Sequence, residues 1–452
     1  MKRNPIVLVL LGWMAGAQST QAAVEPGLIF SGDSQRSDVT HPKQSVDALS
    51  VEGQLRWSEQ WNLEQSSYLD VRAFLSNEET ALRDEEVGRS AGSQSDKYLA
   101  LRQLWWRYQP LNWTGFPGES LTVGLQRQQS EDSNWWDANL ESLGWRLQTS
   151  TTKASLAVGE RLDTYRTDDS ELDPYDDHKL RVFGELLQDW RPYQALTGRF
   201  MYATQSGQDV EDFSTGDPQG VNGNWLWLGV GATSEWFNRR QPAQPWAYHL
   251  EWTWLQGEAD FLPSSSAGSR NYDLNASALD AGVRYDFYLP QRLAVGLQYA
   301  YGSGGADADS SDVFVQTGLN SNRQRFLGNR QSLYRLNDVL RADLSNLQQW
   351  SLFVGAEPLT DLELGAAFSW LRRNDAALPV YSLGTPLPVT LNGSNDIGQG
   401  ADMVASWYFH SLLDNPQEGR VRLRGSVFET GAAFADDGQW EHRWVLDLML
   451  NF

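Results

Sequence analysis

Three arginines alternate with apolar residues near the C-terminus, in the stretch GRVRLRGSVF, residues 419 to 428. Successive side chains of a β-strand point to opposite faces, so Arg420, Arg422 and Arg424 would share one face of a strand. The planar donor fork of a guanidinium group suits carboxylates, which it can bind through two hydrogen bonds. The chemistry that this face predicts is therefore the binding of anions.

Two explanations fit three aligned arginines in a chain whose formal net charge is -22. In the first they form a structural ladder, neutralised by acids such as Asp447 of the last strand. In the second they line a path along which anions move. A further basic cluster favours the path, because the segment QTGLNSNRQRFLGNRQSLYRL is rich in arginine and poor in acids. Its arginines are Arg323, Arg325, Arg330 and Arg335.

The elements that must position these arginines show the same alternation. In WAYHLEWTW the large apolar side chains from Trp246 to Trp254 fall on one face of a strand, opposite His249 and Glu251. AVGLQYAYG and LELGAAFSWLRR repeat the pattern. Large rings on one face and small or polar residues on the other are typical of a transmembrane β-barrel. A soluble β-sandwich or β-helix is the alternative, although its packed core would place large side chains inside.

The chain ends in the same pattern. In EHRWVLDLMLNF one apolar stripe is formed by Trp444, Leu446, Leu448, Leu450 and Phe452. This ending resembles the signal by which bacterial outer-membrane barrels are recognised for insertion. It therefore favours the barrel and predicts a multi-pass protein of the outer membrane of a Gram-negative bacterium.

The first 23 residues have the composition of a secretory signal peptide. Lys2 and Arg3 precede an apolar run from Ile6 to Ala17, and small residues up to Ala23 offer a cleavage site. A membrane-anchoring helix is the alternative, but the run is shorter than the roughly 20 apolar residues that a span needs. We therefore expect residues 1–23 to be removed and residues 24–452 to form one domain.

Composition narrows the function further. The chain has no cysteine, which excludes disulfides and thiolate metal sites. Its acidic balance argues against a nucleic-acid partner. Polar, glycine-rich stretches, which we read as loops, separate the strand-like segments at 76–97, 167–179, 204–224, 257–275 and 302–314. At about 24 residues per strand, loops included, the mature chain predicts roughly 16 to 18 strands around a water-filled lumen.

Several stretches resemble the alginate export family of outer-membrane porins. They are KYLALRQLWWRY, GLQRQQSEDSNWWDANLESLGW, RLDTYRTDDSELDP, YGSGGADA, QTGLNSNRQRF and RADLSNLQQW, in order along almost the whole mature chain. The resemblance implies an all-β, 18-stranded antiparallel barrel with occluding loops. It also implies that an electropositive constriction selects the polyuronate alginate, which leaves the periplasm for the cell surface, and that periplasmic secretion proteins are partners.

The resemblance assigns residues one at a time. Asp137 in WWDAN and Asp168 in YRTD match acids that the family places beside the constriction, where they orient arginines. One family arginine falls on Ser332, which Arg330 and Arg335 flank, and we include Arg330 in the predicted pathway. The residues matched to arginines of the family's pore are Arg56, Arg102, Arg127, Arg323, Arg422 and Arg424.

Two other functions remain open at this point. A porin that imports oligouronates or other small organic anions would have a similar lumen. An outer-membrane hydrolase would need an ordered serine and histidine pair, and the GDS block at Gly32–Ser34 is the one candidate for its nucleophile. The Asp-rich run 306–312 has ligands that calcium takes, but we favour a solvated loop and predict neither a cofactor nor a metal site.

Overall fold

The computed structural model describes residues 21–40, 46–78, 96–169, 171–208, 220–237, 244–261, 270–305, 310–410 and 418–452. Regular structure in these ranges consists of β-strands. No helix among them is long and apolar enough to cross a membrane. The predicted signal peptide lies almost wholly outside the described residues, and the boundary at residue 24 stays a prediction.

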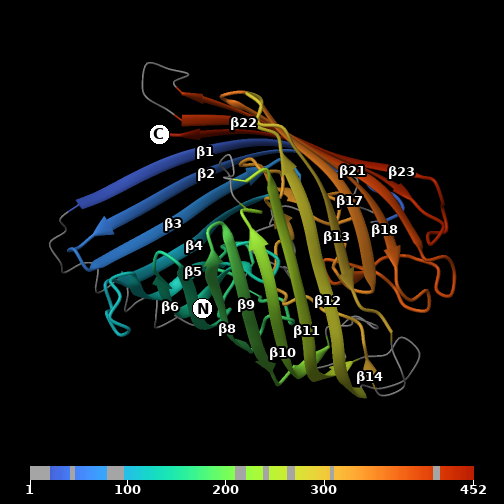
Figure 1. Ribbon diagram of the computed structural model, residues 1–452, viewed down its shortest axis with the longest axis horizontal. Helices are drawn as coiled ribbons and strands as arrows, with labels where there is room; N and C mark the ends of the chain where they lie inside the picture. The colour runs from blue at the N-terminus through green and yellow to red at the C-terminus, as the bar shows by residue number, and fades with distance from the viewer. Residues whose placement is uncertain are drawn as a thin grey trace.

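The strands close into one antiparallel barrel, as predicted, with 18 strands in its wall (Figure 1). Each wall strand pairs with its neighbours in the chain, and the first strand pairs with the last, which closes the wall. The wall strands are β1 (Gln21–Arg36), β2 (Val46–Gln60), β3 (Gln65–Ser76), β4 (Lys97–Tyr108), β5 (Glu119–Gln129), β6 (Asp137–Gln148), β7 (Thr152–Glu160), β8 (Lys179–Arg191), β9 (Gln194–Gln205), β10 (Val221–Ser234), β11 (Trp246–Phe261), β12 (Arg270–Asp286), β13 (Ala294–Gly302), β17 (Leu347–Leu359), β18 (Leu362–Arg373), β21 (Asp396–His410), β22 (Glu418–Thr430) and β23 (Trp440–Asn451).

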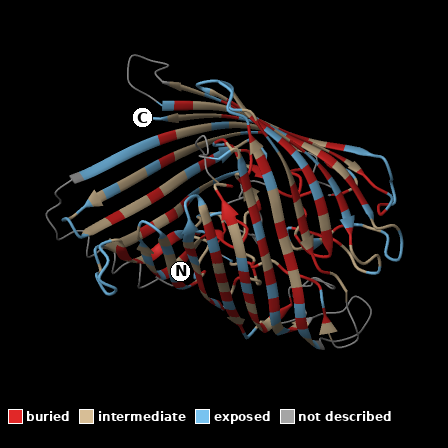
Figure 2. Ribbon diagram, in the orientation of Figure 1, coloured by how far each residue is buried: buried red, intermediate tan, exposed pale blue. Residues whose placement is uncertain are grey.

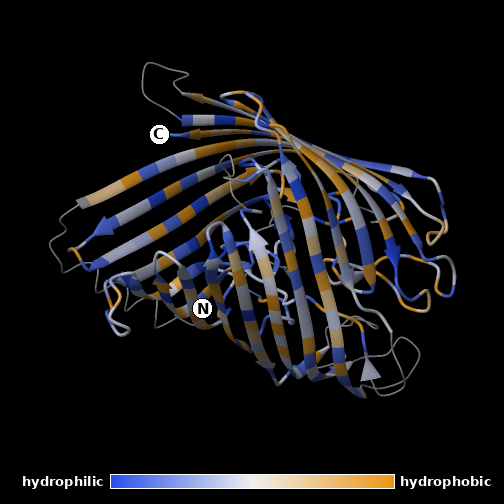
Figure 3. Ribbon diagram, viewed as in Figure 1, coloured by the Kyte–Doolittle hydropathy of each residue, from blue (hydrophilic) through white to orange (hydrophobic). Residues whose placement is uncertain are grey.

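Alternation decides which side chains face outward. On β11, Trp246, Leu250 and Trp254 are exposed on the outer face, whereas His249 and Glu251 are buried inside. Exposed and buried bands alternate along the wall strands in Figure 2, and apolar and polar bands do so in Figure 3. Since the outer face is apolar, the wall matches a lipid bilayer.

The two ends of the barrel differ in the length of their connections. At the end where β1 starts and β23 ends, β2–β3, β6–β7, β8–β9 and β17–β18 are joined by two to four residues. At the opposite end the connections include residues 161–178, 303–346 and 374–395. Short turns are periplasmic and long loops extracellular in bacterial barrels, so the start of β1 and the end of β23 mark the periplasmic end.

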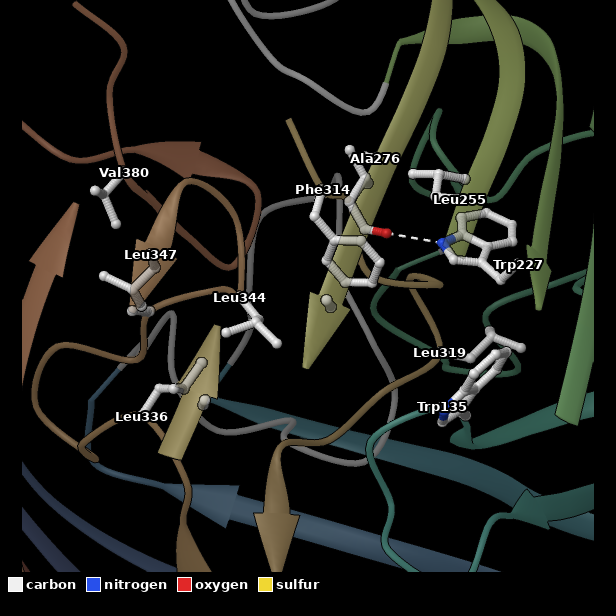
Figure 4. Packing of buried hydrophobic residues seen from close by; sticks show 14 of the residues in the cluster. Trp135, Trp227, Leu255, Ala276, Phe314, Leu319, Leu336, Leu344, Leu347 and Val380 are labelled. Carbon is white, nitrogen blue, oxygen red and sulfur yellow. Dashed lines mark hydrogen bonds between the residues drawn. The ribbon is translucent and has the colours of Figure 1, made fainter. Parts of the chain in front are cut away.

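The connection between β13 and β17 returns into the barrel. We call its residues 310–346 the lumen segment; it contains the two-residue strands β14 (Ser310–Ser311), β15 (Arg323–Gln324) and β16 (Leu333–Tyr334). Its side chains pack on the inner wall, and Trp227 of β10 donates a hydrogen bond to the carbonyl of Val315 at 2.8 Å (Figure 4). Leu327 lies directly against the inward-facing Gly355 and Gly365 of the opposite wall.

One expectation about loops was wrong in part, and a second was too short. The predicted loop 257–275 is largely strand, because β11 runs to Phe261 and β12 starts at Arg270. The predicted loop 302–314 is only the beginning of a much longer excursion. Sequence alternation cannot show this excursion, because the lumen segment is irregular and its burial comes from contacts with distant strands. A further short hairpin, β19 (Tyr381–Ser382) and β20 (Thr385–Pro386), lies in the connection to β21.

Candidate functional site: arginines of the lumen

The arginines of β22 face the lumen, and the carboxylate of Asp447 lies beside two of them. Asp447 of β23 lies opposite Arg422 in the strand register, and Arg422 donates to its Oδ2 atom from Nε at 2.9 Å and from Nη2 at 2.7 Å. Ser31 of β1 donates to the other oxygen of Asp447 at 2.6 Å. The side chain of Asp447 is 5% exposed and that of Arg422 is 21% exposed. The acid is thus buried in the wall, and the guanidinium group is the more exposed partner of the pair.

The lumen segment contacts the same arginine face. Asp338 of this segment lies 3.9 Å from Arg424, which is also 3.8 Å from Asp447. Asp338 accepts a second contact from Arg443 of β23 at 3.1 Å. Arg323 is close enough to Arg422 for their charges to interact. Three of the predicted pathway arginines, Arg323, Arg422 and Arg424, therefore meet at one place in the lumen.

Arg127 and Asp137 form a second unit of the same kind. Arg127 of β5 donates from Nε to Asp137 Oδ1 of β6 at 2.7 Å. The other oxygen of Asp137 accepts from the hydroxyl of Ser321 at 2.9 Å, and its backbone N–H bonds to the carbonyl of Leu319 at 2.6 Å. Arg127 is 40% exposed, whereas Asp137 is 6% exposed. The position of Arg127 consequently depends on both the wall and the lumen segment.

Arg102 and Asp168 lie near the connection between β7 and β8. Arg102 is the extra residue of a β-bulge on β4, because Asp70 and Val71 of β3 pair with Gln103 and Leu101. Its buried side chain lines a small hollow with Arg166 and other residues of the connection. Asp168 forms an ion pair with Arg166 at 2.8 Å in the same connection. Both groups thus belong to a region where the connection folds back over the inner wall.

The two remaining predicted arginines lie apart from these units. Arg56 of β2 is opposite Glu25 of β1 and Asp70 of β3 in the register, on the inner face of the wall. Arg330 of the lumen segment pairs with Glu363 of β18 near the periplasmic end. The structure therefore spreads the predicted residues along the lumen instead of collecting them in a single ring.

Sequence reasoning missed a buried charged network on β9 and β11. Arg199 donates to Asp132 and to Glu251, and the indole N–H of Trp135 donates to Glu251 at 2.6 Å. Burial alone would raise the pKa of Asp132, but the Arg199 charge lowers it below the ordinary value. Alternation along β9 could have placed Arg199 inside, because Leu196 and Tyr202 face outward. Its partners come from distant segments and leave no local pattern.

One group of side chains in this network has the spacing of a metal site. Ligand atoms of Asp132, His249 and Glu251 lie within 4.8 Å of one another. The guanidinium group of Arg199 already bonds to both carboxylates, so this cluster has its cation within the chain. We infer that the network holds the β5–β6 connection in place, because Trp135 of this connection bonds to Glu251 and precedes Asp137 by two residues.

A closed antiparallel wall, an apolar outer face and arginines directed into the lumen define a porin of the bacterial outer membrane. Solved structures with this fold include two Pseudomonas aeruginosa proteins. OccK3 (OpdO) has a TM-score of 0.54 at 12% identity, with 96% of both chains covered. OccK2 (OpdF) has a TM-score of 0.55 at 10% identity, with 96% of this chain and 99% of that chain covered.

The particular kind of porin follows from the sequence comparisons. The model of the family described as alginate export matches residues 29–445, and the chain belongs to this family. The alginate production protein AlgE of Pseudomonas aeruginosa is 32% identical over 395 residues, which cover 82% of this chain and 78% of the relative. AlgE of Azotobacter vinelandii is 32% identical over 393 residues, covering 80% and 77%. The resemblance drawn from the sequence motifs is confirmed.

Proposed function

We propose that this porin is an anion-selective channel that exports the polyuronate alginate from the periplasm to the cell surface. Membership of the alginate export family supports the substrate and the direction. One structural observation supports the selectivity: in the pairs Arg127–Asp137 and Arg422–Asp447, the acid is buried and the arginine is the more exposed partner. A passing carboxylate would therefore meet guanidinium groups rather than the acids that hold them.

Such pairs suit transport better than tight binding. Each guanidinium group is already stabilised by its own carboxylate, so a uronate gains only part of the ion-pair energy at each step. Weak sites in series let a polymer enter without being trapped. The lumen segment narrows the water-filled path, because it packs on the inner wall from β10 to β22. Alginate, membrane lipid and periplasmic secretion proteins are the partners that this function implies.

We propose no catalytic role for the chain. In the GDS block, Ser34 donates its hydroxyl hydrogen bond to Asp47 at 2.7 Å, and Asp33 pairs with Arg443. These contacts give both side chains a structural explanation. Import of oligouronates differs from export only in direction, and the family supports export. Measuring alginate secretion by a strain that lacks the gene, with and without a plasmid copy of it, distinguishes export from import.

Planar-bilayer recording tests the channel directly. We expect a reversal potential in a salt gradient that reports preference for anions over cations. We also expect mannuronate and guluronate oligomers to block the current, most strongly at low salt, where screening of the arginine charges is least. A cation-selective channel, or one indifferent to these oligomers, would contradict the proposal.

A further inference from the structure

A polar hollow of about 390 Å³ lies at the periplasmic mouth of the barrel. It is bordered by the turn between β12 and β13, by the turn between β17 and β18, and by the periplasmic tip of the lumen segment. This volume is in the range of about 300–1,000 Å³ that is typical of small-molecule sites. Its charged side chains are Arg292, Arg330, Glu357 and Glu363.

The two ion pairs of the hollow have the same orientation. Arg292 pairs with Glu357 at 2.8 Å; the arginine is 52% exposed and the glutamate 12%. Arg330 pairs with Glu363; the arginine is 43% exposed and the glutamate 2%. Although the four charges sum to zero, the guanidinium groups are presented to solvent and the carboxylates are withdrawn into the wall. The accessible lining is therefore basic.

Arg330 is held in place by three contacts. Its backbone N–H donates to Glu363 Oε2 at 3.2 Å, and its Nε donates to the other oxygen of the same carboxylate. The guanidinium carbon lies 3.8 Å from the ring centroid of Tyr408 on β21. The hydroxyl of Tyr408 accepts from Gln331 at 3.0 Å. These contacts use Nε and one face of the guanidinium plane, so the terminal Nη donors are oriented before a ligand arrives.

The hollow leads toward the arginines of β22. Tyr408, which packs on Arg330, is directly opposite Arg420 in the strand register. Arg420 contacts the sulfur of Met449, and within the described residues it has no carboxylate partner. Arg422 follows two residues further from the periplasm on the same face. A polymer that left the hollow would next meet Arg420 and then the Arg422–Asp447 pair.

From this geometry we propose that the Arg292–Arg330 hollow is the entrance subsite, which binds uronate carboxylates as the polymer arrives from the periplasm. The inference rests on the proposed export function and specifies its first binding step. Both glutamates face inward, away from lipid, so the hollow suits a ligand that approaches through the lumen mouth rather than a lipid headgroup. Capture at the mouth raises the local concentration of chain ends next to the β22 arginines.

Sided block of a channel in a planar bilayer tests this role. The variant is Arg292→Gln with Arg330→Gln; glutamine is chosen because its amide still donates to the buried glutamates. A mannuronate hexamer is added to the periplasmic or to the extracellular side of channels inserted in one known orientation. We expect periplasmic block to weaken by about tenfold, the effect of losing one charged hydrogen bond, while extracellular block changes little. The salt-gradient reversal potential should shift toward cations, because the two arginine charges are lost and both glutamates keep theirs.

Two controls keep the result interpretable. Arg36→Gln removes an exposed arginine of the opposite end, which pairs with Asp47, and should leave block from both sides unchanged. The double variant Arg292→Lys with Arg330→Lys keeps both charges and should retain most of the periplasmic block. It also serves as the test variant if the glutamine variant assembles poorly.

If wild-type channels are blocked from both sides and the glutamine variant retains full periplasmic block, the proposed entrance subsite is wrong, whereas the proposed export function stands. If the hexamer fails to block the wild-type channel, the proposed function itself fails.

Discussion

Asp447 binds Arg422 through a single carboxylate oxygen, and its other oxygen accepts a hydrogen bond from Ser31 on the far side of the barrel closure. The acid therefore links β22, β23 and β1 at the point where the first and last strands meet. The two explanations drawn from the sequence, a neutralised ladder and an anion path, coexist here. The acid stabilises the wall, and the arginine still presents donors to the lumen.

Replacing Arg422 and Arg424 together with alanine should lower the preference for anions. Two positive charges leave the inner face, and Asp447 keeps its negative charge with neither arginine beside it. The shift in reversal potential should be largest at low salt, because the Debye length is about 30 Å at 0.01 M and about 8 Å at 0.15 M. Bilayer recording in potassium chloride gradients measures it. An unchanged reversal potential together with unchanged block by alginate oligomers would remove β22 from the anion path.

Arginine on the opposite face of the same strand should act on assembly instead. Val421 and Leu423 alternate with the three arginines of β22 and face the lipid. Each change to arginine should cost roughly 2 to 4 kcal/mol near the bilayer midplane. The yield of heat-modifiable barrel in outer-membrane fractions reports this cost. Val421→Ala with Leu423→Ala is the matched control, and normal yield of the arginine variant would place this face away from lipid.

The sequence predicted the inner face of β22 because alternation is a local property. In any strand, the side chains of Arg422 and Arg424 point to one face and those of Val421 and Leu423 point to the other. The same logic predicted the outward tryptophans of β11, whereas the length of the chain predicted the strand number within a narrow range. The assignment of Arg127 needed the family resemblance, since its own strand has a weak pattern.

Contacts between distant segments could not be predicted in this way. Asp338, which joins Arg424 and Arg443, lies in an irregular stretch whose position depends on the whole lumen segment. Arg330 belongs to the same cluster in the sequence as Arg323, yet it lies at the periplasmic mouth. Register and loop packing decide these partners, and neither is encoded in a short pattern.

Removal of Phe452 should impair assembly of the barrel. Its backbone N–H bonds to the carbonyl of Pro26 on β1 at 3.0 Å, and its ring completes the outward apolar stripe of the last strand. The truncated chain loses a hydrogen bond at the barrel closure and the last aromatic group of the predicted insertion signal. Comparison with Phe452→Tyr, which keeps an aromatic ring, isolates the signal. Wild-type amounts of folded barrel in the truncated strain would contradict the prediction.

Asp137 should influence selectivity through Arg127 alone. If the carboxylate only orients the guanidinium group, then Asp137→Asn, Arg127→Gln and the double variant should shift the reversal potential by non-additive amounts. We expect the double variant to resemble Arg127→Gln. Asp168→Asn is the matched comparison, because this acid holds Arg166 and its effect should add to that of Arg127→Gln. Additive effects of Asp137 and Arg127 would show that the pair does not act as one unit.

The connection between β7 and β8 should stay docked in moderately acidic solution and loosen only near pH 2. Burial alone would raise the pKa of Asp176, but the charges of Arg161 and Arg181 outweigh it and lower the pKa from 3.8 to about 2. A group whose pKa is lowered by folding contributes stability above its unfolded pKa, and this contribution is lost as the pH falls through the folded value. Protection of residues 171–178 against hydrogen exchange, corrected for the intrinsic rate at each pH, should therefore persist at pH 4 and fall toward pH 2.

Asp176→Asn leaves two buried arginines without their charge partner, at a cost of roughly 3 to 5 kcal/mol, and should reduce protection at neutral pH as well. Loss of protection in the wild-type protein already near pH 5, or full protection in the asparagine variant, would show that this ion pair does not hold the connection against the wall.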